Sequence, residues 1–325
     1  MSAVMSSRVT GKASRSLIKR VRQLQQKKYR TIHAQFVVEG KKAIQDFVEN
    51  GYEPVHLLRT DELRTREERK DENERSSGVM MMKSKSNASS ISSSRWWWQN
   101  ENGAHSESIE LVTSADMQDM TGLKTACDSL AVFSKREDEY LNAAVFSSSS
   151  SSSSSFSSLS SRKDELLDVD VNLALDSVRD PGNLGTIIRI CDWFGLRHLI
   201  LSHDCCDCYI PKVVRATSGS LARVKVHYVE SLSQELERLE VPVIGASAKG
   251  SSIYASEFSF PSSGVLVVGN EGQGLSEEVT QVLDQTVSIP SYGEDAESLN
   301  VAVATGILIS EIKRSGNAST ITEGR

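Results

Sequence analysis

Three short turns in the last third of the sequence decide its fold. They read DPGNLG at residues 180–185, GNEGQG at residues 269–274, and IP at 289–290 followed by ESLN at 297–300. Each turn follows a run of residues that is typical of a buried strand and precedes a segment with helical periodicity. Because such turns of a parallel sheet meet at one edge, we expect the three to form a crevice that binds a ligand.

From residue 165 onward, predicted strands alternate with predicted helices. The strands are expected at residues 171–175, 198–201, 223–227, 241–246, 264–268 and 286–289. This alternation is typical of a mostly parallel sheet with helices on both faces. The fold class expected for this part of the chain is therefore α/β.

A smaller α/β module is expected before residue 145. Its predicted strands are residues 36–39, 55–58, 109–113 and 130–133, and its predicted helices are residues 41–50 and 114–121. Leu17, Val21 and Leu24 recur at helical spacing, which predicts a further helix that belongs to the same module. We expect the strands to share one sheet.

Low-complexity segments divide the chain into predicted domains. The prediction is a basic arm at 1–15, an N-terminal domain at 16–145, a serine-rich linker at 146–164 and a C-terminal domain at 165–325. An insertion at about 61–105 holds three consecutive methionines and three consecutive tryptophans. The tryptophans could stack on bases, but their serine-rich surroundings favour a disordered surface insertion.

The first 38 residues are strongly basic, with nine Lys and Arg residues and no acidic residue. Two interpretations remain open: an organelle transit peptide or an arm that neutralises phosphates. The compartment is accordingly either the cytoplasm or an organelle (mitochondrion or plastid). Five cysteines without framework spacing indicate a reducing environment, and no apolar run approaches the roughly 20 residues needed to span a bilayer.

Several side chains at the turns suggest binding chemistry. Arg189 follows the first turn and could bind a phosphate, or it could be a solvated arginine at the rim of the helix. Glu271 in the second turn would repel a pyrophosphate and favours a cationic or neutral ligand. Ser298 and Asn300 stand at an expected helix start, where both are also good capping residues.

A metal site is a weaker alternative. His203, Cys205, Cys206 and Cys208 lie close together in the sequence. Their spacing is too tight for the two Cys-x-x-Cys arms of a usual zinc site, and cysteine often packs as a small apolar side chain. The prediction is that no metal is bound.

The three turns together resemble the three signature motifs of the SpoU/TrmH family, which are RNA ribose 2′-O-methyltransferases of the SPOUT superfamily. The resemblance rests on DPGNLG with Arg189, on GNEGQG, and on IP with SLNV at 298–301. KVVRATSG at 212–219 also resembles a segment that the family carries between its first two motifs. Residues 25–40 are similar to the N-terminal RNA-binding domain of the same family.

This resemblance implies a fold, a reaction and a set of site residues. It implies a C-terminal trefoil knot, S-adenosyl-L-methionine as the cofactor, a homodimer whose interface completes the active site, and methylation of a ribose 2′-hydroxyl. The RNA substrate is expected to be rRNA, with tRNA as the alternative. The residues implied for catalysis are Arg189, Ser298, Asn300, Asn183 and Glu271, and those implied for cofactor binding are Gly269, Ile289, Leu299 and Asn270.

The role of Arg189 is open between a general base and an electrostatic clamp. Arginine stays protonated in proteins, which favours the clamp on the phosphate next to the target ribose. Two rival functions also stay open: an RNA-binding relative without catalysis, and a SPOUT enzyme that methylates a base. The intact motif residues argue against the first, and the SLN sequence disfavours the second.

Overall fold

The computed structural model describes residues 9–60, 109–136, 171–256, 258–261, 263–293 and 298–316. The predicted insertion with its tryptophans, the serine-rich linker, Glu297 and the first eight residues lie outside these ranges. The chain divides into two compact units, Met1–Lys135 and Arg136–Arg325. The boundary predicted within the linker therefore stays a prediction.

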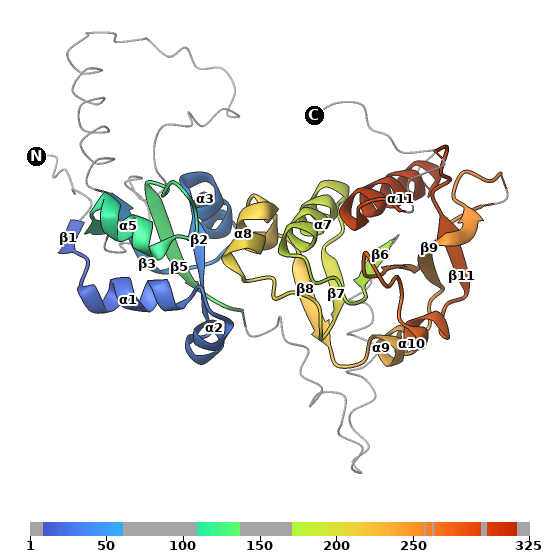
Figure 1. Cartoon of the computed structure of the whole chain (residues 1–325), viewed down its shortest axis with the longest axis horizontal. Helices are drawn as coiled ribbons and strands as arrows, with labels where there is room; N and C mark the ends of the chain where they lie inside the picture. Colours follow the sequence, from blue (N-terminus) through green and yellow to red (C-terminus); the bar gives the residue numbers. More distant parts are fainter. Residues whose placement is uncertain are drawn as a thin grey trace, which may run out of the picture. The chain divides into compact units, whose positions relative to one another are not determined.

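Unit 1 contains one mixed sheet of five strands in the order β1-β4-β3-β5-β2 (Figure 1). The strands are β1 (Val9–Lys12), β2 (Gln35–Glu39), β3 (Pro54–Thr60), β4 (Ile109–Val112) and β5 (Ser129–Ser134). The helices are α1 (Arg15–Gln23), α2 (Lys27–His33), α3 (Lys41–Glu49) and α5 (Ser114–Met120). The predicted single sheet is confirmed, while β1 and α2 were not predicted.

Two apolar layers stabilise unit 1 on opposite faces of its sheet. On one face, Leu17 and Val21 of α1 pack with Met117 and Met120 of α5. On the other, aromatic rings from α3, the sheet and the loop between α3 and β3 pack together, with Phe47 and Tyr52 at 4.9 Å between ring centroids. Burial of these side chains is the dominant force that holds the sheet between its helices.

Unit 2 contains six parallel strands in the order β11-β9-β10-β6-β7-β8, which confirms the predicted α/β class. The strands are β6 (Asn172–Leu175), β7 (His198–Ser202), β8 (Lys225–Val229), β9 (Val243–Ser252), β10 (Val265–Val268) and β11 (Gln285–Ser288). The helices are α7 (Pro181–Phe194), α8 (Pro211–Thr217), α9 (Leu232–Leu239), α10 (Glu277–Thr280) and α11 (Val301–Gly316), with a short 3-10 turn at Ser220–Ala222.

Helices cover both faces of this sheet, as predicted (Figure 1). The face that carries α9 and α10 is closed by Leu232, Leu236 and Val279 against Ala174 and Val267. α7 lies on the other face and packs against α8 and α11. Within the described residues, none of the helices has the length and apolar character required to cross a membrane.

Candidate active site

The three turns follow β6, β10 and β11, so they all lie at the carboxyl-terminal edge of one parallel sheet. Local sequence explains the first. Asp180 Oδ1 accepts a hydrogen bond from the Asn183 backbone N–H at 2.9 Å and Pro181 occupies the first turn of α7, which together fix where that helix begins. The three motifs therefore share one edge of the sheet, as predicted, while the ligand-binding crevice at that edge stays a prediction.

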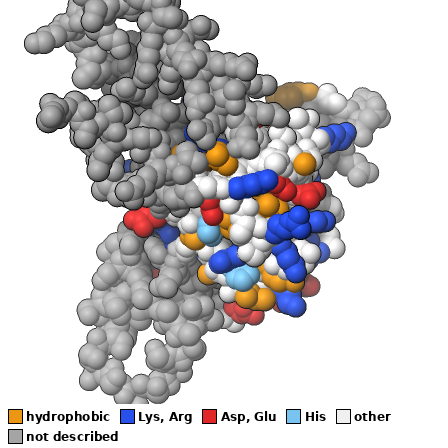
Figure 2. Space-filling model, turned by 90° about the vertical axis from the view of Figure 1, so that its left-hand side faces the viewer, with side chains coloured by type: hydrophobic (Ala, Val, Ile, Leu, Met, Phe, Trp, Pro, Cys, Tyr) orange, Lys and Arg blue, Asp and Glu red, His pale blue; other side chains and the backbone are white. Residues whose placement is uncertain are grey.

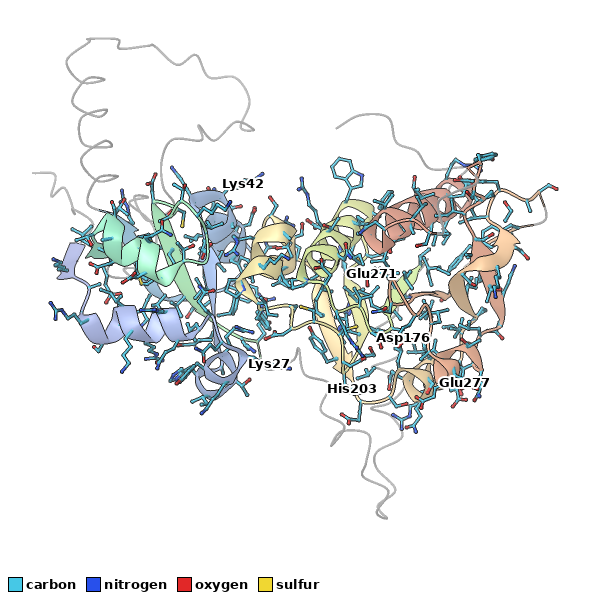
Figure 3. All side chains as sticks on the ribbon, viewed as in Figure 1. Lys27, Lys42, Asp176, His203, Glu271 and Glu277 are labelled. Carbon is cyan, nitrogen blue, oxygen red and sulfur yellow. The ribbon has the colours of Figure 1, made fainter. Side chains whose placement is uncertain are left out.

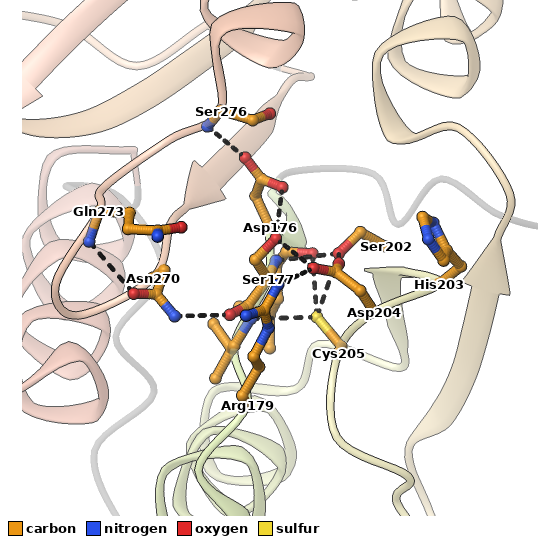
Figure 4. A network of polar contacts seen from close by, with 12 residues as sticks. Asp176, Ser177, Arg179, Ser202, His203, Asp204, Cys205, Asn270, Gln273 and Ser276 are labelled. Atoms are coloured by element: carbon orange, nitrogen blue, oxygen red, sulfur yellow. Dashed lines mark hydrogen bonds and ion pairs between the residues drawn. The ribbon is translucent and has the colours of Figure 1, made fainter.

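Asn270 organises the second turn. Its backbone N–H and C=O both pair with Gly274 at 2.9 Å, and its side-chain oxygen accepts the N–H groups of Gly272 and Gln273 at 2.9 and 3.1 Å. Its side-chain nitrogen donates to the Ser177 carbonyl at 2.8 Å, which ties the second turn to the segment that leads from β6 into the first turn (Figure 4). One amide side chain therefore holds two of the three turns in a fixed relation.

Gly269 allows this turn to close. A Cβ atom at this position would lie 2.3 Å from the Gly274 carbonyl oxygen and 2.6 Å from the Leu275 nitrogen. Both contacts are to backbone, and no rotamer change could relieve them. Glycine is consequently the one residue type that fits the turn as it is built.

Polar side chains from all three turns meet above the sheet edge. The Asn183 side-chain nitrogen donates to a Glu271 carboxylate oxygen, and the Asn300 side-chain nitrogen donates to the Asn183 side-chain oxygen at 2.9 Å. Glu271 lies beside α7 in Figure 3. The bonded residues are 88 and 117 positions apart in the sequence, so this chain of hydrogen bonds is a product of the fold.

The structure does not bring every predicted site residue into this cluster. Arg189 is exposed on α7, six positions after Asn183, and has no hydrogen-bond or ion-pair partner within the described ranges. Ser298 is exposed as well and has no hydrogen-bond partner there. Asn300 also caps α11, because its side-chain oxygen accepts the N–H groups of Ala302 and Val303.

The two apolar residues predicted to contact the cofactor border the third turn. Ile289 is half-buried and follows β11 directly. Leu299 is 49% exposed and immediately precedes Asn300. An exposed leucine next to a polar cluster at a sheet edge is a natural apolar contact for a ligand.

A polar network beneath the first turn was not predicted (Figure 4). Asp176 is only 4% exposed and accepts the backbone N–H of Ser276 at 2.7 Å, across 100 positions. Asp204 accepts hydrogen bonds from Ser202, Ser177 and Arg179, each at 2.7 Å. The sequence did contain a signal for this network: Asp176 directly follows β6, and Ser202 is the last residue of the neighbouring strand β7.

Charge in this network is fixed by its hydrogen bonds. Burial raises the pKa of Asp204, but the bonds from Arg179, Ser202 and Ser177 outweigh burial and hold that pKa well below its usual range. Burial raises the pKa of the neighbouring Cys205 thiol to about 11. Asp204 is therefore a stable anion at neutral pH, and Cys205 is a neutral, packed thiol.

Two of the four residues of the metal alternative make other contacts in the structure. Cys205 packs its sulfur near the Val178 N–H and the Leu175 carbonyl, and His203 instead pairs with the Glu230 carbonyl at 3.0 Å. Among the residues that the structure describes, there is no group of three or more His, Cys, Asp or Glu side chains able to hold a metal ion.

An apolar groove of about 560 Å³ lies between α7 and α11. Its lining includes Ile190 and Phe194 of α7, Val303 and Gly306 of α11, and Tyr254. Val303 is 51% exposed, and Trp193 of α7 is 83% exposed. Large apolar side chains are thus exposed on the same two helices that begin at the polar cluster.

The fold and the cluster define a class: an α/β protein with amide, carboxylate and glycine backbone groups gathered at the carboxyl edge of a parallel sheet, the place where such folds bind ligands. Residues 170–310 match the SpoU rRNA Methylase family, and residues 15–95 match the MRM3-like substrate binding domain. The likeness to the SpoU methylases therefore lies in the C-terminal part of the chain.

Individual relatives agree with this assignment. The chain is 37% identical to the 23S rRNA (guanosine(2553)-2′-O)-methyltransferase RlmP of Bacillus subtilis over 143 aligned residues. The aligned residues make up 43% of this chain and 57% of that protein. It is 34% identical over 146 residues to a Synechocystis protein named as an uncharacterized tRNA/rRNA methyltransferase. That alignment covers 44% of this chain and 53% of the Synechocystis protein. The chain spans about half the length of the curated relatives it matches.

Solved structures extend the similarity to both domains. A TrmH-family protein from Porphyromonas gingivalis is similar with a TM-score of 0.64 and 29% identity, over 93% of this chain and 98% of that chain. An AdoMet-bound rRNA methyltransferase from Sinorhizobium meliloti is similar with a TM-score of 0.64 and 25% identity, over 95% and 98% of the two chains.

Proposed function

We propose that this protein uses S-adenosyl-L-methionine to methylate a ribose 2′-hydroxyl in structured RNA, with rRNA as the substrate. The observation that carries the proposal is the chain of hydrogen bonds from Glu271 through Asn183 to Asn300. Each of these residues belongs to a different motif, and together they place polar groups beside the glycine turn and the exposed Leu299.

The residues at the turns fit the cofactor. Ile289 and Leu299 offer apolar surface for an adenine ring, while the backbone of Gly269, which a side chain would crowd, offers polar groups for the edges of that ring. The Glu271 carboxylate favours the positive charge of a sulfonium. The resemblance further implies that the chain is threaded as a trefoil knot at this place.

The bound cofactor supplies a methyl group that is already activated by its sulfonium. The protein therefore has two tasks, to align the 2′-oxygen with that methyl and to assist loss of the hydroxyl proton. Ser298 and Asn300 orient the hydroxyl, while Arg189 holds the adjacent phosphate and stabilises the negative charge that develops on the 2′-oxygen. Arg189→Lys should therefore lose most of its turnover, whereas near-full activity would exclude a bidentate clamp.

A homodimer explains why Arg189 has no partner among the described residues. One side of α7 carries Thr186, Arg189 and Trp193 at helical spacing. Thr186 lines the apolar groove, and Trp193 is exposed next to Phe194, which also lines it. A second copy seated on this groove would cover Val303 and Trp193 and bring Arg189 to a shared site. Sedimentation should give a dimer for the native chain and a monomer without methyl transfer for Val303→Glu.

Calorimetry tests the cofactor assignment directly. Heat should be released when S-adenosyl-L-methionine or its demethylated product is titrated into the full chain. Leu299→Ala should lower the affinity for both compounds. The absence of heat at concentrations where the dimer persists would refute the proposal. Methyl transfer to RNA from labelled cofactor then separates an enzyme from an RNA-binding relative without catalysis.

rRNA is favoured over tRNA by two observations. The relative from Bacillus subtilis acts on 23S rRNA, and the structurally similar Sinorhizobium meliloti protein is an rRNA methyltransferase. Primer extension at low nucleotide concentration, on RNA from cells that lack the gene, should lose one stop in rRNA. A lost stop in tRNA would favour the alternative.

A further inference from the structure

A cationic face on unit 1 is formed by the exposed sides of α1 and α2. Leu17 and Val21 form the buried stripe of α1, whereas Arg15, Lys19 and Arg22 form an exposed stripe at the same helical spacing. The two stripes are offset by two positions, about 200°, and so lie on opposite sides of the helix. The three cations consequently point away from the core in one row about 10 Å long.

α2 follows α1 after three residues and adds two exposed cations. Lys27 and Lys28 are exposed in its first turn, and neither α1 nor α2 contains an acidic residue. The cationic face is defined here as Arg15, Lys19, Arg22, Lys27 and Lys28. α5, which packs beside α1, carries Asp116 and Asp119, so acidic side chains bound the face on that side.

Arg30 fixes the two helices relative to each other. Its side chain is 1% exposed and donates to the carbonyls of Leu24 and Gln25, each at 2.9 Å. These carbonyls form the turn between α1 and α2. The cation of Arg30 thus serves the fold, and the exposed cations around it are held on a rigid support.

Aromatic side chains lie next to the cations. Tyr29 and His33 stack on α2 with their rings 13° from parallel and 6.4 Å between centroids, and Lys28 Nζ lies 6.0 Å from the Tyr29 ring. Ile32 is 61% exposed on the same helix. Figure 2 shows Lys and Arg side chains on the face that it presents to the viewer, with His, apolar and some acidic side chains among them.

We infer that this cationic face, together with the Tyr29–His33 pair, binds an unpaired segment of the RNA that the protein modifies; the inference rests on the proposed function. Cations in a row neutralise successive phosphates, and flat rings beside them stack on bases that a helix would hide. A-form duplex RNA is recognised through its backbone and 2′-hydroxyl groups and offers no free base to stack. The face therefore fits a loop or bulge better than a paired stem.

Fluorescence anisotropy of the full chain tests this. The probes are an RNA hairpin with a large loop and a fully paired duplex of equal length. Lys19→Gln/Arg22→Gln should weaken hairpin binding and lower the slope of log affinity against log salt by about 1.4, since each lost single-strand phosphate contact removes about 0.7. Lys42→Gln/Lys124→Gln, with the same charge change, is the matched control, and Lys42 lies on the other side of unit 1 from Lys27 (Figure 3).

Tyr29 tests the choice of unpaired RNA. Tyr29→Ala should weaken hairpin binding by about 5- to 150-fold and leave duplex binding unchanged, while Tyr29→Phe should retain the affinity of the native chain. Equal salt slopes for the two double variants, or equal loss for hairpin and duplex in Tyr29→Ala, would overturn the inference. Loss in Tyr29→Phe equal to that in Tyr29→Ala would overturn the stacking role.

Methyl transfer separates this inference from the proposed function. Lys19→Gln/Arg22→Gln should raise KM for RNA and leave kcat unchanged, because neither residue touches the reacting atoms. If the native chain binds the hairpin but transfers no methyl group, the proposed function is wrong and the RNA-binding face stands. If transfer occurs and the double variant matches its control, the face is wrong and the function stands.

Discussion

Gly269→Ala should disrupt the second turn by steric conflict alone. The added Cβ would lie 2.3 Å from the Gly274 carbonyl oxygen, where ordinary van der Waals contacts begin at 3.4 Å, so the backbone must move by about 1 Å. That movement strains the two hydrogen bonds between Asn270 and Gly274, each worth about 0.5–1.5 kcal/mol, and overpacking costs about 1–3 kcal/mol. We expect a loss of about 2–4 kcal/mol in the free energy of unfolding.

Gly272→Ala is the matched control. It lies in the same turn, but the nearest atom to an added Cβ, the Asn270 side-chain oxygen, is 3.6 Å away. Its effect should stay within about 0.5 kcal/mol. Thermal unfolding of the full chain should place Gly269→Ala about 4–16 °C below Gly272→Ala, and calorimetry should show loss of cofactor binding in the first variant alone. Equal stability and equal cofactor affinity in the two variants would refute the steric account of the turn.

Three further outcomes follow from hydrogen-bonded charged side chains. Arg30→Ala should cost about 2–4 kcal/mol in urea unfolding, because the buried Leu24 carbonyl and the part-buried Gln25 carbonyl lose a charged donor. Lys28→Ala should be nearly neutral, and a neutral Arg30→Ala would contradict the role of Arg30 in fixing α1 against α2. Asp176→Ala should cost about 1.5–3 kcal/mol by leaving the Ser276 N–H without its acceptor, with Asp176→Asn costing less. The Asp204 pKa is lower in the folded state than in the unfolded state, so its stabilising contribution is present above about pH 4 and is lost as the pH falls through the folded value. The stability advantage over Asp204→Asn should shrink accordingly in acid, and a constant difference between pH 7 and pH 3 would exclude this linkage.

Local signals were sufficient to predict most of unit 2. Asp180 and Pro181 fix the start of α7 by capping chemistry that acts within one turn, and continuous apolar runs are characteristic of strands buried on both faces. The strand expected at 223–227 is instead β8 (Lys225–Val229). Arg223 is drawn into an ion pair with Asp192 of α7 at 2.8 Å, a contact that no local pattern reveals.

Long-range contacts account for what the sequence did not predict in unit 1 and at the site. β1 is short and contains lysine and glycine, and it is a strand because it pairs with β4, about 100 positions away. Arg30 stands within a basic run and resembles the exposed cations around it, yet it is buried. Motif resemblance predicted Asn183, Glu271 and Asn300, but their mutual hydrogen bonds depend on how β6, β10 and β11 are ordered in the sheet.

Nucleoside analysis after methyl transfer tests the central claim most directly. The full chain would be incubated with rRNA and S-adenosyl-L-methionine that carries a labelled methyl group, and the RNA would then be hydrolysed in alkali. A 2′-O-methyl group blocks attack of that oxygen on the neighbouring phosphate, so the account predicts label in alkali-stable dinucleotides for the native chain and none for Asn300→Ala. Label recovered in mononucleotides that carry a methylated base, or no label at all, would contradict it.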